Sequence, residues 1–337
     1  MIISSQSETE LKQPKKSKVL EDKSNDLESL RPKQILNYIG QNSIKKQLNI
    51  ILESSRIRQK LPEHILFYGP PGLGKTTLAS LISNELNLNF KTISAPSLQK
   101  QGDIVTLLLN LEPKTILFID EIHRLKSLLE ETLYTAMEDR QVDLVMGKGA
   151  GAQSTRLNLP EFTLIGATTM LGKISKPLKD RFASIFQMQP YTNLEIISLI
   201  EKNTVLLGLN LENSAKEYIA SRSRGVPRVV NNILKRFLDF QVVHNLKILD
   251  LKTTQSFLLD LGILDFGLTM AEINYLKAVK ENPLGLQTLA NILNEEIETI
   301  EYNLEPYLMQ LGFIDKTSRG RIVTLKGKNF LENAQIL

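Results

Sequence analysis

The chain has 337 residues and a formal net charge of +4, a length that predicts about two or three domains and a charge that leaves any nucleic-acid binding to local basic patches. Hydrophobic residues make up 42% of the chain and charged residues 23%, as in ordinary globular proteins, and no apolar run approaches the ~20 residues that a membrane helix needs. With no cysteine, the chain has neither a disulfide framework nor a thiolate zinc site, so we expect a protein of the reducing cytoplasm.

Residues 1–30 predict a disordered tail, because Ser, Lys, Glu and Gln dominate there and large apolar residues are few. The acidic residues of this stretch argue against an organelle transit peptide, and no apolar segment marks a secretory signal. Regular structure is expected from about residue 31. The spacing of Ile44, Leu48, Ile51 and Leu52 then predicts a helix with one apolar face.

A phosphate-binding loop is the next feature. Residues 64–68 predict a buried strand, and the helical apolar spacing begins at about Thr77. Between them the sequence matches the pattern G-x-x-x-x-G-K-[ST], with the residues Gly69, Pro70, Pro71, Gly72, Leu73, Gly74, Lys75 and Thr76. The backbone N–H groups of such a loop and the helix N-terminus together attract phosphates. We expect Lys75 to reach the β- and γ-phosphates and the Thr76 hydroxyl to ligate Mg²⁺, so the chain is predicted to bind a nucleoside triphosphate.

Strands and helices alternate after this loop. Residues 90–93 and 115–119 predict strands, and residues 103–111 predict a helix. This alternation, with near-continuous apolar strands, indicates an α/β fold in which helices cover both faces of a parallel sheet. Ligands of such sheets bind at the carboxyl ends of the strands, where the phosphate-binding loop lies.

Two carboxylates follow the strand at residues 115–119. A carboxylate at a strand end can hold Mg²⁺, directly or through water, and this is the role expected for Asp120. A second carboxylate can orient and deprotonate an attacking water, which suits Glu121. His123 has no partner at metal-ligand spacing, so we interpret it as a local hydrogen-bonding residue.

A β-hairpin with a glycine-rich tip is predicted next, from residues 142–146 and 155–157. Its apolar residues Leu144, Met146 and Leu157 could form a small contact patch for a partner. The residue types alone are equally consistent with a hairpin that folds back on its own core.

The rest of the chain predicts two further units. Residues 191–263 are expected to be all-helical, a block that fits a lid packed over the nucleotide. The last ~70 residues predict three helices and then two short strands around a basic turn, which is the pattern of a winged helix.

The winged helix has an unusual charge distribution. The helix that would enter the major groove in a helix-turn-helix carries five glutamates, and residues 287–315 contain no lysine or arginine. The wing instead contains Lys316, Arg319 and Arg321 and no acidic residue. We therefore expect the wing to contact DNA phosphates without reading bases, and the alternative is a solvated basic hairpin.

Further motifs occur in a fixed order along the chain. They are Asp120-Glu121-Ile122-His123-Arg124-Leu125, Ala136-Met137-Glu138-Asp139, Gly166-Ala167-Thr168-Thr169, Leu178-Lys179-Asp180-Arg181-Phe182, Arg222-Ser223-Arg224-Gly225-Val226-Pro227-Arg228 and Glu305-Pro306-Tyr307-Leu308. Together with the phosphate-binding loop they resemble the RuvB family of AAA+ ATPases, the bacterial Holliday-junction branch-migration motors. The resemblance implies an AAA+ P-loop NTPase core at residues 31–190, a helical lid at 191–263 and a winged-helix DNA-binding domain at 264–337.

The resemblance also implies residue roles. Thr169 matches the sensor-1 residue, which contacts the γ-phosphate or the attacking water. Arg181 matches the arginine finger, which acts on the ATP of a neighbouring subunit, and Arg228 matches the sensor-2 arginine. Tyr38 and Ile39 belong to a segment that lies over the adenine.

The implied assembly is a hexameric ring on duplex DNA. In this family the ring hydrolyses ATP to pump DNA through a four-way junction bound by RuvA, during recombination and repair. The hairpin at residues 142–157 docks on RuvA, and RuvC belongs to the same complex.

Two other kinds of protein remain open. One is a clamp-loader-type AAA+ subunit, although many of these carry a cysteine zinc module that this chain lacks. The other is an ATP-switched winged-helix regulator that reads an operator, against which the acidic recognition helix argues. Comparison of junction and random duplex binding, with and without RuvA, would distinguish the three.

Overall fold

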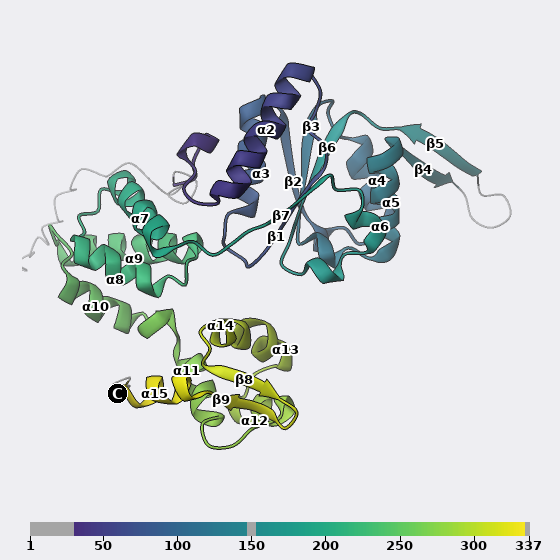
Figure 1. The fold of residues 1–337 in the computed structure, drawn as a ribbon. Helices are drawn as coiled ribbons and strands as arrows, with labels where there is room; N and C mark the ends of the chain where they lie inside the picture. Colours follow the sequence, from purple (N-terminus) through teal and green to yellow (C-terminus); the bar gives the residue numbers. More distant parts are fainter. Residues whose placement is uncertain (1–29, 147–152, 334–337) are drawn as a thin grey trace, which may run out of the picture.

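The computed structural model describes residues 30–146 and 153–333, and these form an α/β domain, a helical domain and a small C-terminal domain (Figure 1). The predicted tail and the predicted glycine-rich hairpin tip lie outside the described residues. Among the described helices, none combines the length and the apolar character needed to cross a membrane.

A five-stranded parallel sheet forms the centre of the α/β domain. Its strands are, in spatial order, β2 (Asn89–Ser94), β3 (Thr115–Asp120), β6 (Phe162–Thr168), β1 (Ile65–Tyr68) and β7 (Ser184–Gln187). All four neighbouring pairs are parallel, so the predicted parallel sheet is confirmed. The edge strand β7 was not predicted, since its four residues carry too short an apolar pattern.

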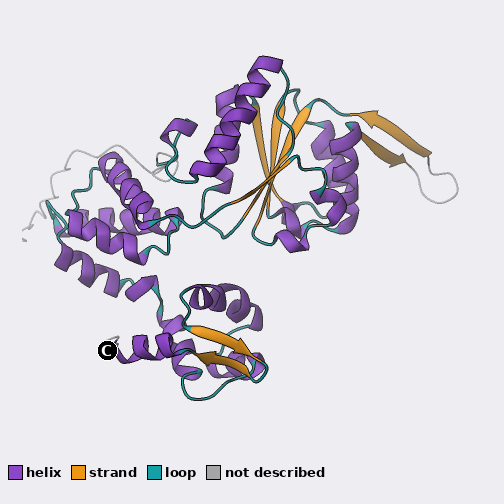
Figure 2. Ribbon diagram, in the orientation of Figure 1, coloured by secondary structure: helices purple, strands orange, loops and turns teal. Residues whose placement is uncertain are grey.

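Helices cover both faces of this sheet (Figure 2). Figure 1 shows α2 (Asn42–Arg58) and α3 (Lys75–Leu86) on one face, and α4 (Gln101–Leu109), α5 (Ser127–Asp139) and α6 (Lys176–Lys179) on the other. Successive side chains of β1 enter different cores: Phe67 packs with the α2–α3 side and Leu66 with the α4–α5 side, both without solvent exposure. A strand buried on both faces has to be apolar at every position, which explains the continuous apolar runs.

The predicted hairpin projects from the sheet domain, away from the helical domain (Figure 1). It consists of β4 (Gln141–Met146) and β5 (Gln153–Asn158), which pair antiparallel with Val142 opposite Leu157.

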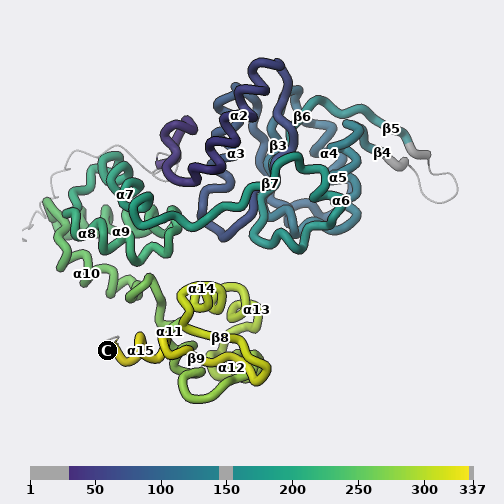
Figure 3. The backbone as a smooth tube through the Cα atoms, viewed as in Figure 1, coloured from purple at the N-terminus to yellow at the C-terminus, as the bar shows by residue number. Residues whose placement is uncertain are grey.

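An extended segment leads from β7 to the helical domain (Figure 3). That domain contains α7 (Asn193–Leu207), α8 (Asn213–Arg222), α9 (Pro227–His244) and α10 (Leu251–Asp260), so the all-helical character predicted for residues 191–263 is confirmed. A capping box of Thr192 and Glu195 starts α7, and Pro227 occupies the first turn of α9. The core of these helices continues into the core on the α2–α3 side of the sheet, so the two domains pack on each other.

The C-terminal domain is the predicted winged helix and has a separate core. Its elements are α11 (Met270–Ala278), α12 (Leu286–Leu293), α13 (Ile297–Thr299), a π-helical turn (Ile300–Leu304), α14 (Glu305–Gln310), β8 (Ile314–Thr317), β9 (Gly320–Val323) and α15 (Leu325–Asn333). The third helix was predicted as one piece. The π turn precedes Pro306, which has no N–H to donate to the preceding turn and would crowd a regular α-helix. The helix α15 was not predicted.

Candidate nucleotide site and DNA-binding wing

The phosphate-binding loop lies at the carboxyl end of β1 and leads directly into α3. Lys75, the first residue of α3, is 7% exposed, and its Nζ donates hydrogen bonds to the carbonyl oxygens of Gly69 (2.7 Å) and Pro70 (2.9 Å). Burial lowers the pKa of Lys75, and the nearby carboxylates Glu121 and Asp120 oppose that shift. The ammonium group is therefore held inside the loop that is expected to surround the phosphates.

Tyr38 is hydrogen-bonded to the backbone of this loop. Its hydroxyl donates to the Leu73 carbonyl oxygen (3.2 Å) and accepts from the Tyr191 hydroxyl (2.9 Å). Burial raises the pKa of both phenols, that of Tyr191 to about 12, so both stay neutral. The Tyr38 carbonyl oxygen accepts from Lys45 Nζ (2.7 Å).

The two predicted carboxylates lie where β3 and β6 end side by side. Asp120 is the last residue of β3, and its Oδ1 accepts from the Glu121 backbone N–H (3.0 Å). Glu121 Oε2 accepts from the Thr169 hydroxyl (3.2 Å), directly after β6. Adjacent parallel strands thus bring together two residues that are 48 positions apart in the chain.

His123 is a part of this cluster that sequence reasoning underestimated. Its Nδ1 lies 3.1 Å from Glu121 Oε2 and 3.0 Å from the hydroxyl of Thr168. Burial lowers the pKa of His123, against the opposing effect of Glu121, so the imidazole is neutral at pH 7. The prediction of a local hydrogen-bonding role is confirmed, but its partner is the proposed catalytic base. Its position two residues after Glu121 was the only signal in the sequence.

The oxygen donors suit a magnesium ion. Thr76 follows Lys75 at the start of α3, and Asp120 lies at the end of β3. In the described part of the chain, no group of three or more His, Cys, Asp or Glu side chains could hold a metal alone. A site with a hydroxyl and a carboxylate suits Mg²⁺, which takes its other oxygen ligands from phosphates and water.

The start of α9 approaches the loop from the helical domain. The Arg228 backbone N–H donates to the Gly72 carbonyl oxygen (3.4 Å), and the positive charge of Arg228 contributes to lowering the pKa of Lys75. Gly72 has φ of +81°, and a Cβ there would lie 2.8 Å from Val226 Cγ1. The helical domain therefore packs directly against the backbone of Gly72, where a side chain on that residue would not fit.

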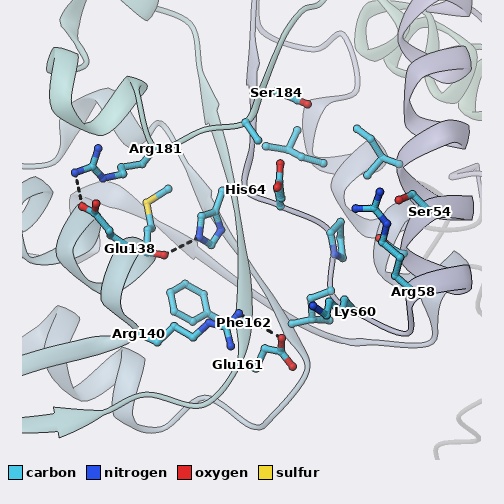
Figure 4. Close-up of a pocket in the computed structure, with 18 of the residues that line it drawn as sticks. Ser54, Arg58, Lys60, His64, Glu138, Arg140, Glu161, Phe162, Arg181 and Ser184 are labelled. Carbon is cyan, nitrogen blue, oxygen red and sulfur yellow. Dashed lines mark hydrogen bonds and ion pairs between the residues drawn. The ribbon is translucent and has the colours of Figure 1, made fainter.

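Arg181 lies near the amino ends of the strands, at the end of the sheet opposite to the phosphate-binding loop. It precedes β7, and Ser184 of that strand pairs with Ile65, the first residue of β1. The phosphate-binding loop follows the last residue of β1, so at least the ~13 Å length of a four-residue strand separates the two. Figure 4 shows Arg181 beside a pocket that Glu138 and His64 also line. Its guanidinium pairs with Glu138, and its Nε is buried with no hydrogen-bond partner among the described residues.

The wing holds its basic residues differently from what we expected. Glu305, only 1% exposed, accepts from Arg321 Nε (2.8 Å) and pairs with Lys316 Nζ (2.6 Å). Burial raises the pKa of Glu305, but Arg321 and Lys316 outweigh this and the net pKa lies below the usual value. Both Arg321 and Lys316 therefore have a carboxylate partner within the domain, and their predicted contact with DNA stays a prediction.

Arg319 is the wing residue that fits the expectation. It is exposed in the turn between β8 and β9, and in the described part of the chain no carboxylate lies within ion-pair distance of it. Lys326 and Lys328, which follow the wing in the sequence, lie on α15 instead.

Of the three apolar hairpin residues predicted to form a contact patch, the structure describes the side chain of one. Leu157 is half-buried and packs against the core that contains Val142, so it is not a free part of a contact patch. For Leu144 and Met146 the structure describes the backbone of β4 only.

Comparison with known families agrees with this three-part organisation. Residues 30–188 match the model of the Holliday junction DNA helicase RuvB P-loop domain, residues 191–263 that of the RuvB AAA lid domain, and residues 265–332 that of the RuvB C-terminal winged helix domain.

Individual proteins match over nearly the whole chain. The Holliday junction branch migration complex subunit RuvB of Aliarcobacter butzleri is 47% identical over 309 residues, 91% of this chain and 89% of that protein. The corresponding Campylobacter hominis protein is 44% identical over 306 residues, 90% of each. A solved structure of the Thermotoga maritima RuvB Holliday junction branch migration motor superposes with a TM-score of 0.80 at 40% identity, covering 90% of this chain and 98% of that one.

Proposed function

The chain belongs to the RuvB family of AAA+ ATPases, and from this premise we propose that it is the ATP-driven DNA motor of a Holliday junction branch migration complex. The observation that carries the proposal is the single chain in which a P-loop nucleotide site, a lid in contact with that site and a winged helix follow one another. Relatives that match about 90% of this chain bear the name of a branch migration subunit or motor. The division at residues 190 and 263 is part of this proposal.

The ATPase chemistry follows from the cluster at the carboxyl edge of the sheet. Mg²⁺ held by Thr76 and Asp120 would neutralise charge on the phosphates. Lys75 and the loop N–H groups bind the triphosphate, together with the rest of the loop and Thr77. Glu121 accepts a proton from the water that attacks the γ-phosphorus, and the bond to the β–γ bridging oxygen breaks to release ADP and phosphate. Thr169 and His123 contact the carboxylate of Glu121 and set its orientation.

A ring completes this site. Arg181 lies at the sheet edge opposite to the loop of its own chain, so it is available to the nucleotide of a neighbour. An arginine supplied in trans is worth about 10³–10⁵ in rate, because it neutralises charge that develops on the transferred phosphoryl group. We propose a hexamer, with Arg228 acting on the nucleotide of its own chain.

Two exposed parts of the chain, the wing turn and the projecting hairpin, are assigned to the proposed partners. Arg319 is the proposed phosphate contact on duplex DNA, a sequence-independent contact that suits a translocating motor. The projecting hairpin with Leu144 and Met146 is the proposed contact with RuvA, and RuvC is a proposed member of the same complex. The absence of cysteine supports a cytoplasmic location.

The test is ATP-dependent dissociation of a synthetic four-way junction in the presence of RuvA. We expect the wild type to dissociate the junction and Glu121→Gln to bind ATP but to lose about 10²–10⁴ in hydrolysis and all dissociation. Glu131→Gln, the same change on an exposed residue of α5, is the matched control.

Other outcomes would contradict the proposal. A clamp-loader-type subunit would hydrolyse ATP but leave the junction intact. A regulator would prefer one duplex sequence over another and would not need hydrolysis to act.

A further inference from the structure

Residues 222–228, which comprise the last residue of α8, the link to α9 and the first two residues of α9, contact two parts of the molecule that are distant in sequence. At one end of this connector, Arg228 and Val226 contact Gly72 in the nucleotide loop. At the other end, Arg222 pairs with Asp265, and Arg224 contacts the winged-helix domain. Arg228 follows Arg224 by four positions, so their Cα atoms are at most ~14 Å apart.

The contact of Arg224 is a specific double interaction. Its Nη1 and Nη2 donate to the two carboxylate oxygens of Glu272, each at 2.7 Å. Its Nε (2.9 Å) and Nη2 (2.6 Å) also donate to the carbonyl oxygen of Gly267. A planar guanidinium bound in this way fixes orientation as well as distance, which a lysine cannot do.

This contact is also enclosed. The side chain of Glu272 is 2% exposed and that of Arg224 is 23% exposed, unlike the surface pairs of this chain. The Arg224 guanidinium lies over the ring of Tyr307 (4.6 Å to its centroid), and the Tyr307 hydroxyl donates to the Phe266 carbonyl oxygen (2.8 Å). Glu272 additionally accepts from the Thr269 backbone N–H (2.8 Å), which starts α11. Glu272 therefore joins Arg224 to the N-terminus of α11, the first helix of the winged-helix domain.

The backbones of the two domains touch at the same place. Gly267 has φ of +73°, and a Cβ on it would overlap the carbonyl oxygen of Arg222. Arg224 itself has φ of +57°, a conformation that L residues with side chains rarely adopt. The connector is thus held in one conformation by the contacts around it.

From these contacts we infer that Arg224 couples the nucleotide to DNA: it is a positioning residue through which the occupancy of the phosphate-binding loop sets the placement of the winged-helix domain. A nucleotide that moves the loop or draws in Arg228 moves the connector, and the Arg224–Glu272 contact moves the DNA-binding domain with it. The inference rests on the proposed motor function. It goes beyond that function because it assigns a residue that contacts neither nucleotide nor DNA.

Thermodynamic linkage makes this measurable. If the nucleotide changes the affinity for DNA by some factor, DNA changes the affinity for the nucleotide by the same factor, and such factors are about 5–150-fold. The readout is the ratio of duplex dissociation constants of the full-length protein with ATPγS and with ADP. The wild type is expected to show a ratio in this range.

Removal of the Arg224 guanidinium should bring the ratio of the two dissociation constants close to one without changing ATP hydrolysis in the absence of DNA. We expect Arg224→Ala to show a ratio of one to about twofold, while its DNA-free ATPase rate stays within about twofold of the wild type. Arg224→Lys, which keeps the charge but loses the double contact, should give an intermediate ratio. Arg236→Ala, on the exposed face of α9, should behave as the wild type.

The outcomes separate the two proposals. If Arg224→Ala and Arg224→Lys both kept the wild-type ratio of dissociation constants, the coupling role would be overturned. The same conclusion would follow if Arg224→Lys had a lower melting temperature but kept that ratio, because the contact would then contribute to stability alone. A wild type that dissociates junctions with ATP but has a ratio of one would also overturn it and leave the motor function intact. Failure of the wild type to dissociate junctions would instead overturn the motor function.

Discussion

At the residue scale, the charged groups of this chain divide into those that are neutralised inside the fold and those left for ligands. Lys316 and Arg321 are used by the buried Glu305, and Arg224 by the buried Glu272. A buried carboxylate needs such partners, because desolvation of an unpaired charge costs several kcal/mol. A residue's type therefore indicates possible chemistry, and its partners decide whether that chemistry is available.

His64 links the stability of the sheet domain to pH. Its Nδ1 accepts from the Leu164 backbone N–H (2.8 Å), so its Nε2 carries the proton toward the Met137 carbonyl oxygen (3.3 Å). Burial lowers its pKa, and protonation of Nδ1 would break the first bond. The unfolded state then binds more protons, so we expect the free energy of unfolding to decrease as the pH falls below about 6.5, by at most ~1.4 kcal/mol per pH unit.

Urea unfolding between pH 8 and pH 5 measures this slope. In His64→Gln the free energy of unfolding should depend less steeply on pH than in the wild type. Some dependence should remain, because His123 contributes a slope of the same sign. An equal slope in His64→Gln would show that His64 is not the titrating group.

At the element scale, the wing is a hairpin attached to the third helix by ion pairs. Lys316 and Arg321 are directly opposite each other in β8 and β9, and both reach Glu305 at the start of α14. This arrangement accounts for two of the five glutamates in the segment that would enter the major groove: Glu305 and, at 3.8 Å from Arg321, Glu301 are partners of the wing. The hairpin turn with Arg319 is then presented to solvent.

Substitution of the two wing arginines should therefore change different properties, DNA binding for Arg319 and stability for Arg321. Arg319→Ala should reduce the slope of log K against log salt for duplex binding by about one unit and leave stability unchanged. Arg321→Ala should lower the free energy of unfolding by about 1–3 kcal/mol, because Glu305 then keeps one cationic partner, Lys316, beside the hydroxyl of Tyr275, and should change the salt slope less. Salt titrations and urea unfolding of both variants test this, and identical behaviour of the two would contradict it.

At the scale of the whole molecule, the candidate nucleotide site is built from elements that the chain brings together from far apart. Lys75, Glu121, Thr169 and Arg228 meet at the carboxyl edge of the sheet, whereas Arg181 lies at the amino edge. The free Nε of Arg181 and its exposed pairing with Glu138 suit a group that exchanges this partner for one on another subunit.

Mixing experiments test the completion of the site by a neighbour. Addition of Arg181→Ala to the wild type should inhibit ATP hydrolysis more than in proportion to its fraction, because each variant subunit disables the site of the next. Arg236→Ala should cause no loss in the same titration. A strictly linear loss with the fraction of Arg181→Ala would show that the arginine acts within its own chain.

The sequence by itself determined the loop from Gly69 to Thr76, the carboxylates at 120 and 121, the parallel sheet, the helical lid and the winged helix. These features are local, since periodicity and motif spacing report on residues that are neighbours in the chain. Only the tertiary structure decided that His123 contacts Glu121, that Glu305 neutralises Arg321 and that Arg224 binds Glu272. Such pairings depend on which strands and helices are adjacent and on what they bury, and no local pattern encodes either. The same reason explains why the four-residue strand β7 was missed: its identity as a strand depends on the hydrogen bonds of β1 beside it.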